Sequence, residues 1–334
     1  MKTTSSYRIL LMTRYILKRL LWAIPLLLVM TFLSFSILQL APGDPTQMFL
    51  DPTMSTQDMA QMRQNLGLDQ PIPVQYVKWL GELVRGNLGY SYQTGKPVLE
   101  SIMERMPATL ILSVSSLFLI VVLTFFLGIF SGARRDGFWD NVITIFSFLG
   151  MAVPTFWLGL MLILFFSVQL NWLPTSGFID VSVAEDGFFP VFLNMLSHAA
   201  LPLVTIVLGS LAKLTRFNRF GVINVLNQDF IRAGRARGLS ENRILYKHAG
   251  KNIALPIVTL LGLSLPDLIG GSFVIEYIFG WPGMGQLGIS AIFSRDYPIL
   301  MGTIVMSSLL IIIGNLAADV LYRYADPRIG VDAA

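Results

Sequence analysis

A polar, basic stretch at residues 215–254 interrupts the otherwise apolar second half of the chain. Asp229 can cap a first helix through its carboxylate, and Ser240 can cap a second helix in the same way. Gly238 lies between them and supplies the backbone freedom that a tight corner between two helices requires. The chemistry of this stretch is therefore recognition: the sequence predicts helix, corner and helix, built to dock another protein.

The second of these helices carries a basic stripe at every fourth residue, formed by Arg243, Lys247 and Lys251. Residues with this spacing share one helical face. Two interpretations stay open for the stripe. It either lies toward anionic lipid headgroups or contacts an acidic surface on a partner.

Residues that would perform catalysis or bind a nucleotide are missing from the sequence. The pairs Gly95-Lys96 and Gly250-Lys251 are followed by proline and asparagine, so neither completes a Gly-x-x-x-x-Gly-Lys-Ser/Thr phosphate-binding loop. There is no His-Glu-x-x-His or Gly-x-Ser-x-Gly segment, and two histidines supply no convincing metal site. Cysteine is absent, which excludes disulfides and thiolate metal sites. We therefore expect no enzyme activity, metal or cofactor in this chain itself.

The composition indicates an integral membrane protein. Of 334 residues, 54% are hydrophobic and 13% charged, and the mean hydropathy is +0.65, which is too apolar for a soluble domain. A span needs roughly 20 apolar residues, and six stretches qualify: 20–40, 109–130, 142–168, 191–214, 254–275 and 299–321. Prolines lie inside four of them: Pro25, Pro154, Pro202, and Pro256 with Pro266. Such prolines are tolerated where neighbouring helices or water satisfy the freed backbone, and they indicate a bundle lining a pathway.

Basic residues predict the orientation in the membrane. With both termini in the cytoplasm, 18 of the 24 Lys and Arg residues lie on the cytoplasmic side, as the positive-inside rule requires. This orientation places residues 215–254 in the cytoplasm. The first apolar run could instead be a signal peptide, but it exceeds the roughly 7–15 residues of a signal core and lacks a suitable cleavage site. We expect a retained first span.

Ionisable side chains in or beside the apolar runs are candidate pathway residues. Asp267 follows a proline inside the fifth run, where a charge is costly unless it faces water or a partner; it lines the pathway or bonds the freed backbone. Glu276 should lie near the outer interface, where it bonds turn amides or meets the amino group of a cargo. His198 lies near the outer end of the fourth span, where it either packs inside the helix bundle or contacts cargo. Asp319 and Arg323 should form an intrahelical ion pair.

Three blocks resemble permease subunits from the peptide and nickel branch of ABC importers. The first is that branch's coupling segment, the EAA loop, matched by Ala233-Gly234, Gly238-Leu239 and the distal Leu255-Pro256. The sequence departs from the family pattern at two positions, because the namesake glutamate falls on Arg232 and the second alanine on Gly234.

The second block, residues 66–91, resembles the outer domain of B-type permeases, and is either a folded cap with aromatic anchors or a contact for a solute-binding protein. The third block, residues 270–285, matches a glycine pair, a glutamate and a Pro-Gly-x-Gly pattern. Small paired residues allow close helix packing in lipid, and the Pro-Gly pair forces a turn at the outer face. The structural residues are Gly270, Gly271, Pro282, Gly283 and Gly285.

The resemblance implies an all-α polytopic membrane protein with six transmembrane helices and the type I ABC importer permease fold. A small external domain lies between spans 1 and 2. The implied order is a cytoplasmic N-terminus at 1–19, a first span at 20–40, the external domain at 41–107, a transmembrane core at 108–323 with the coupling loop 215–254, and a cytoplasmic tail at 324–334.

The resemblance also implies a function: half of the translocation pathway for di- or oligopeptides in a bacterial or archaeal cytoplasmic membrane. Implied partners are a second homologous permease, two cytoplasmic ABC ATPases that hold ATP and Mg²⁺, an external solute-binding protein and membrane lipid, but no nucleic acid. The implied ATPase-coupling residues are Asp229, Arg232, Ala233, Gly234, Gly238, Leu239, Ser240 and Glu241. The alternative is a stand-alone secondary transporter driven by an ion gradient through Asp267.

Overall fold

The computed structural model describes residues 2–40, 69–183, 185, 187–250, 252–253 and 272–325. Within these ranges the chain is helical, and its only β-pairing is an isolated bridge between Tyr90 and Pro97. The helices are α1 (Lys2–Leu40), α3 (Ile72–Val84), α4 (Val98–Ala133), α5 (Phe138–Ala152), α6 (Thr155–Leu162), η2 (Ile163–Gln169), η3 (Val181–Val183), α7 (Phe188–Leu226), α8 (Asp229–Ala236), η4 (Arg243–Ala249), α10 (Met284–Phe293) and α11 (Tyr297–Ala325).

Four helices in the described part are long and apolar enough to cross a membrane, at Thr13–Leu40, Val98–Ala133, Phe188–Leu226 and Tyr297–Val320. They contain the predicted first, second and fourth spans and nearly all of the sixth. The bent pair Phe138–Ala152 and Thr155–Gln169 contains the third and makes five if counted as one span. The predicted fifth span, 254–275, lies almost wholly outside the described residues. α7 also continues to Leu226, so the predicted coupling loop begins as a helix.

The third span contains a break where the sequence predicts a kink. α5 ends at Ala152 and α6 begins at Thr155, and the helical segments Phe138–Ala152 and Thr155–Gln169 are bent by 103° relative to each other. Val153 has an extended backbone (φ −90°, ψ 122°), because the proline ring at Pro154 excludes the helical conformation of the residue before it. Pro25 and Pro202, in contrast, lie inside continuous helices.

The chain divides into two compact units: Met1–Pro107 with Gly283–Ile312, and Ala108–Pro282 with Ile313–Ala334. The first unit contains α1 and α3, which pack through a buried cluster of Phe35, Tyr76 and Met301. The Tyr76 hydroxyl lies 2.9 Å from Thr31 Oγ1 and 3.1 Å from the Leu28 carbonyl oxygen on α1. These contacts hold α3 against α1.

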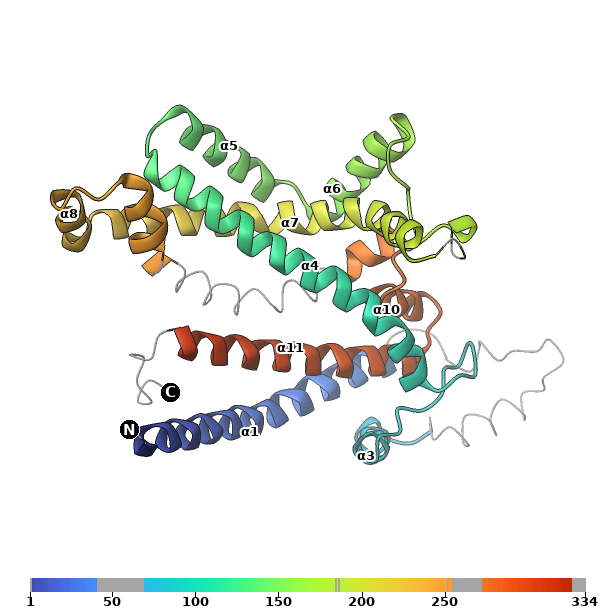
Figure 1. The fold of residues 1–334 in the computed structure, drawn as a ribbon. Helices are drawn as coiled ribbons and strands as arrows, with labels where there is room; N and C mark the ends of the chain where they lie inside the picture. The colour runs from blue at the N-terminus through green and yellow to red at the C-terminus, as the bar shows by residue number, and fades with distance from the viewer. Residues whose placement is uncertain are drawn as a thin grey trace. The chain divides into compact units, whose positions relative to one another are not determined.

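In the second unit, α4, α5 and α7 lie together, and α8 lies at the end where α4 passes into α5 (Figure 1). α4 and α7 approach closely through a Gly-x-x-x-Gly pair. A Cβ atom at Gly128 would lie 2.2 Å from Asn218 Nδ2, and one at Gly132 would lie 2.7 Å from Val222. Small residues at this spacing let two helix backbones meet in lipid, and the Asn218 amide donates to the Thr124 carbonyl at 2.8 Å.

Candidate functional site

The helix that follows α7 begins one residue earlier than the predicted cap at Asp229 implies. The N-cap position of α8 is Gln228, and Asp229 is the first helical residue, so the predicted side-chain cap by Asp229 is wrong. Its carboxylate oxygen Oδ1 instead lies 3.5 Å from Arg232 Nη1. An acidic group in a first helical turn still interacts favourably with the helix dipole.

Gly238 ends α8 in the conformation that the prediction requires. Its φ is +74°, which lies in the left-handed region that glycine adopts without steric cost. The Gly238 amide donates to the Arg235 carbonyl at 2.9 Å, and the Leu239 amide donates to the Gly234 carbonyl at 3.2 Å. This pair of bonds is the Schellman motif, which satisfies the last carbonyls of a helix. The predicted glycine corner is confirmed.

Leu239 packs toward the protein. A Cβ atom at Gly234 would lie 3.6 Å from Leu239 Cδ1, so this glycine makes room for the leucine. Leu239 also packs against a buried corner cluster formed by Ile129, Val222, Val225, Ile231, Ile244, Ala249 and Ile253. Gly234 and Leu239 therefore join the corner to α4 and α7, while Gly238 itself is exposed.

The second helix begins at Glu241, directly after Ser240, and continues into η4. The Ser240 carbonyl accepts a hydrogen bond from the Ile244 amide at 3.0 Å, but the Ser240 side chain makes no capping bond in the described part of the chain, so its predicted side-chain cap is wrong. Glu241, the next residue, forms a bidentate ion pair with Arg235. Its Oε1 and Oε2 accept hydrogen bonds from Arg235 Nε at 2.8 Å and Nη2 at 3.2 Å, which link the two sides of the corner. The outward surface includes Asp229, Arg232 and Ala233, all exposed. Arg243 and Lys247 are exposed too, whereas Lys251 lies outside the described residues.

The Arg235–Glu241 pair predicts a pH dependence for the corner. Hydrogen bonding from the Arg235 guanidinium lowers the pKa of Glu241 below its ordinary value of 4.5. The pair therefore stabilises the corner fully above that value and is lost as pH falls through the lower folded-state pKa. We expect Glu241→Gln, which mimics protonation, to speed hydrogen exchange at the Gly238 and Leu239 amides at pH 7. Asp229→Asn, which neutralises an exposed carboxylate at the other end of α8, should change those rates less. Equal rates in all three proteins, or an equal change in both variants, would contradict the role of the pair.

A buried ion pair, absent from the sequence-based prediction, lies at the start of α5. The Asp140 side chain is 1% exposed, and both its oxygens accept hydrogen bonds from Arg219 of α7, at 2.6 Å each. Ser131 of α4 donates to the same carboxylate, as does the Asp136 amide at 2.8 Å. Charge-assisted bidentate bonds of this kind are strong and directional. Asp140 thus ties α4, α5 and α7 together on the unit that carries α8.

A turn at residues 279–280 follows the helical segment that contains Glu276, and the predicted bond from the Glu276 carboxylate to turn amides stays a prediction. Glu276 is fully buried, with its carboxylate 3.4 Å from Ser272 Oγ, and its carbonyl accepts from the Trp281 amide at 2.8 Å. Gly280 has a φ of +59°. Trp281 is also fully buried and donates through Nε1 to the Ala108 carbonyl at 2.9 Å.

The Pro-Gly pair that follows lies between helices, as predicted: Gly283 is the N-cap residue of α10, directly after Pro282, and Gly285 is buried inside that helix. Gly270, Gly271 and Asp267 lie outside the described residues, so their predicted packing and pathway roles stay predictions.

His198 is buried in the second unit and has polar partners. Its Nδ1 lies 2.9 Å from the Asn194 carbonyl oxygen, and its Nε2 lies 3.6 Å from Asp180 Oδ1. The Asn194 amide group donates to Asp180 at 2.7 Å. These contacts describe a packed histidine, and its contact with cargo stays a prediction.

Asp296, in the first unit, organises a loop that the sequence analysis did not single out. Its carboxylate is buried and accepts from the Ser91 hydroxyl, the Tyr92 and Gln93 amides, and the Ile299 amide at 3.4 Å. It thereby caps α11 and fixes the loop before α4. Burial, followed by the charge of Asp296 and then Tyr297, raises the pKa of Tyr92.

We expect Asp296→Ala to lower the free energy of unfolding by roughly 2–4 kcal/mol, because a helix cap and several bonds to a buried carboxylate are lost together. Thermal unfolding of the purified chain in detergent measures this. The free energy of unfolding of Asp296→Asn should lie between those of wild type and Asp296→Ala. The asparagine oxygen can still accept hydrogen bonds, whereas the amide nitrogen faces other donors. Glu100→Ala, at an exposed carboxylate in the same unit, serves as the control, and an equal effect of both alanine variants would contradict the prediction.

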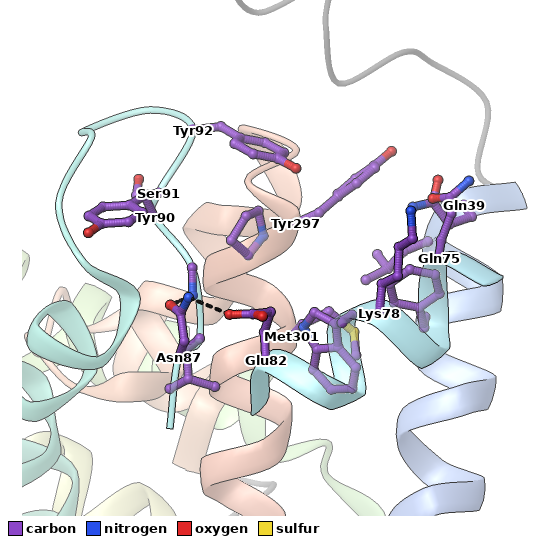
Figure 2. Close-up of a pocket in the computed structure, with 16 residues that line it drawn as sticks. Gln39, Gln75, Lys78, Glu82, Asn87, Tyr90, Ser91, Tyr92, Tyr297 and Met301 are labelled. Carbon is purple, nitrogen blue, oxygen red and sulfur yellow. Dashed lines mark hydrogen bonds between the residues drawn. The ribbon is translucent and has the colours of Figure 1, made fainter. Parts of the chain in front are cut away.

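The Asp296 loop forms one wall of a cavity of about 560 Å³. Figure 2 shows Tyr90, Tyr92 and Tyr297 on one side of it, with Gln39, Gln75 and Lys78 grouped on the other. Such a volume is typical of ligand pockets. Among the described residues, no group of three or more His, Cys, Asp or Glu could hold a metal ion.

The fold and these sites define a multi-pass helical membrane protein with a corner between two short helices. Leu239 packs this corner against the protein, and Gly238 is exposed at its tip. The chain belongs to the family of binding-protein-dependent transport system inner membrane components, whose model matches residues 124–331; the model of the N-terminal part of such components matches residues 12–115.

Several relatives match over nearly their whole length. The chain is 44% identical over 319 residues to the oligopeptide transport system permease protein AppB of Bacillus subtilis, covering 95% of this chain and 99% of AppB. It is 40% identical to a putative peptide permease protein of Brucella suis, covering 96% and 100%. The structure is similar in fold to a chain of the inward-facing MetNI methionine ABC transporter, with a TM-score of 0.54 and 18% identity, over 68% of this chain and 97% of that one.

Proposed function

We propose that this chain is a permease subunit of an ATP-driven importer and forms half of a translocation pathway for peptides. The observation that carries the proposal is the glycine corner at Gly238, where a Schellman motif presents the outer face of α8 while Leu239 fixes the corner to the rest of the unit. Membership of the transport family and relatives described as peptide permeases support it. No relative supports a stand-alone ion-coupled transporter acting through Asp267.

In the proposed assembly, the chain has six spans with both termini in the cytoplasm of a bacterial or archaeal cell, and the external domain follows the first span. It pairs with a second permease, two cytoplasmic ATPases dock on α8 and the corner, and an external solute-binding protein delivers the cargo. The chain has no phosphate-binding loop of its own, so ATP and Mg²⁺ belong to the ATPases.

The proposed coupling follows the contacts of the second unit. Closure of the ATPase dimer moves α8, and the corner cluster transfers this motion to α4 through Ile129 and to α7 through Val222 and Val225. Asp140 and Arg219 join the same helices to α5. The helices then move as one body, because these contacts are packed and directional rather than loose. This motion opens the pathway outward, and hydrolysis resets it.

Reconstitution of the whole transporter in proteoliposomes tests the proposal. With binding protein outside and ATP inside, labelled tripeptide should accumulate, and vesicles lacking this chain should accumulate none. Accumulation driven by an ion gradient without ATPases would overturn the proposal, and so would ATP-driven uptake that does not need this chain.

A further inference from the structure

The cavity in the first unit is formed by well-defined elements and takes no part in the proposed coupling. Its floor is one face of α3, one wall is the end of α1, and the other walls are the start of α11 and the loop that Asp296 fixes. Below it lies the buried cluster of Phe35, Tyr76 and Met301. The cavity is therefore lined by α1, α3, α11 and the loop before α4, with a packed cluster beneath it.

The side chains of α3 fall into three groups, and one of them lines the cavity. Tyr76 faces α1 and is buried. A second face carries the exposed apolar side chains Val74, Val77 and Val84. The face that lines the cavity carries Gln75, Lys78, Trp79 and Glu82. At about 100° per residue, the centre of its three polar residues lies about 120° around the helix from the centre of the valines. The amide, ammonium and carboxylate groups that Gln75, Lys78 and Glu82 bring to the lining suit a soluble ligand with polar ends.

The cavity offers two opposite charges one helical turn apart. The ion pairs in the described part of this unit, Arg85–Glu82 and Lys96–Glu104, do not include the Lys78 ammonium. Glu82 accepts from the Asn87 amide at 2.9 Å, as Figure 2 shows, and from Arg85 at 2.9 Å. Hydrogen bonds from Asn87 and then Arg85 lower the pKa of Glu82, which stays ionised. Residues four apart on a helix are about 6 Å apart along the axis.

We propose that this cavity binds a short, zwitterionic peptide at the outer face of the permease, with its carboxylate on Lys78 and its amino group toward Glu82. A chain of two or three residues spans roughly 7–10 Å, which matches the charge spacing together with the reach of a lysine side chain. The aromatic side chains of Trp79, Tyr90 and Tyr297 receive an apolar peptide side chain. Gln39 and Gln75 can bond the peptide backbone.

The proposal rests on the proposed function, since it takes the cargo to be a peptide, and it adds a receiving site outside the membrane-spanning helices. Such a site would hold a peptide after its release from the binding protein. The site lies within the first unit alone, so it does not depend on the coupling corner.

Equilibrium binding of radiolabelled Ala-Phe-Ala to the assembled transporter in lipid nanodiscs, without binding protein or ATP, tests the proposal. We expect saturable binding that Lys78→Gln weakens about tenfold, the size of effect of one charge-assisted hydrogen bond. Lys96→Gln removes a lysine whose side chain is 55% exposed in the same unit and that does not line this cavity, so it should bind as wild type does. Ala-Phe-Ala blocked by N-acetylation and C-amidation should not compete.

Absence of saturable binding, equal binding by wild type and Lys78→Gln, or full competition by the blocked peptide would overturn the site. A phospholipid that mass spectrometry finds retained by wild type and lost from Lys78→Gln would also overturn it, because lipid would then be the occupant. ATP-driven uptake with binding protein separates the two proposals. Uptake without cavity binding refutes only the site, whereas no peptide uptake at all refutes the proposed function.

Discussion

Replacing Asp140 with alanine should destabilise the protein by about 2–4 kcal/mol and abolish coupled transport. The substitution leaves the Arg219 guanidinium without its bidentate partner, and breaking a buried pair from one side costs several kcal/mol because the remaining charge stays desolvated. Arg219 is 25% exposed, so water recovers part of that cost. The loss also frees Ser131 of α4 and the Asp136 amide.

A double-mutant cycle measures the Asp140–Arg219 interaction by thermal unfolding in detergent. Arg219→Ala on the Asp140→Ala background should cost much less than Arg219→Ala alone, because the partner is already gone. Asp136→Asn, at an exposed carboxylate beside the pair, should change stability by less than about 0.5 kcal/mol. Additive single effects would contradict a direct interaction.

The second large effect is expected at the crossing of α4 and α7. Gly128→Val adds a Cβ atom that would lie only 2.2 Å from Asn218 Nδ2, which is too close for two non-bonded atoms. Either the Asn218 amide loses its bond to the Thr124 carbonyl or the helices separate. Overpacking costs about 1–3 kcal/mol and the lost buried bond about 1–3 more, so we expect a loss near 4 kcal/mol or a failure to fold.

Gly221→Val on α7 is the matched control, because a Cβ atom there has nothing within 4 Å. Its effect should stay within about 1 kcal/mol. Yield and the thermal midpoint in detergent report both variants, and Gly128→Ala shows whether even one methyl group is too large. Equal stability of Gly128→Val and Gly221→Val would mean that the close crossing does not form.

The sequence alone predicts the features that depend on local pattern. Apolar runs locate four spans in long helices and a fifth in the bent pair, and the glycine at position 238 predicts a corner whose Schellman bonds join residues only three and five apart. Asp229 was predicted as a cap from its residue type. The structure begins the helix there because Gln228 already has the extended backbone of an N-cap residue (φ −77°, ψ 153°).

The features that sequence reasoning missed depend on distant partners. Asp140 pairs with a residue 79 positions away, and Asp296 accepts from Ser91, 205 positions away. Each carboxylate sits at the start of a helix, where an exposed capping residue is the ordinary interpretation. Only tertiary packing shows that both are buried. One weak signal in the sequence could have indicated that these carboxylates are buried. Each lies beside a long apolar run, and serine and arginine residues in other runs are available as partners.

Docking at Gly238 is tested by recovering the ATPases with the tagged chain from solubilised membranes and comparing wild type with Gly238→Val. Valine at a φ of +74° is strained by about 1–2 kcal/mol and its side chain projects from an exposed corner. Gly81→Val is the control, on the exposed surface of α3 with open space around it. We predict that a second permease and the ATPases come down with wild type and Gly81→Val, and that the ATPases are lost from Gly238→Val while the second permease remains. ATPases recovered equally with all three proteins, or with none, would contradict docking at this corner.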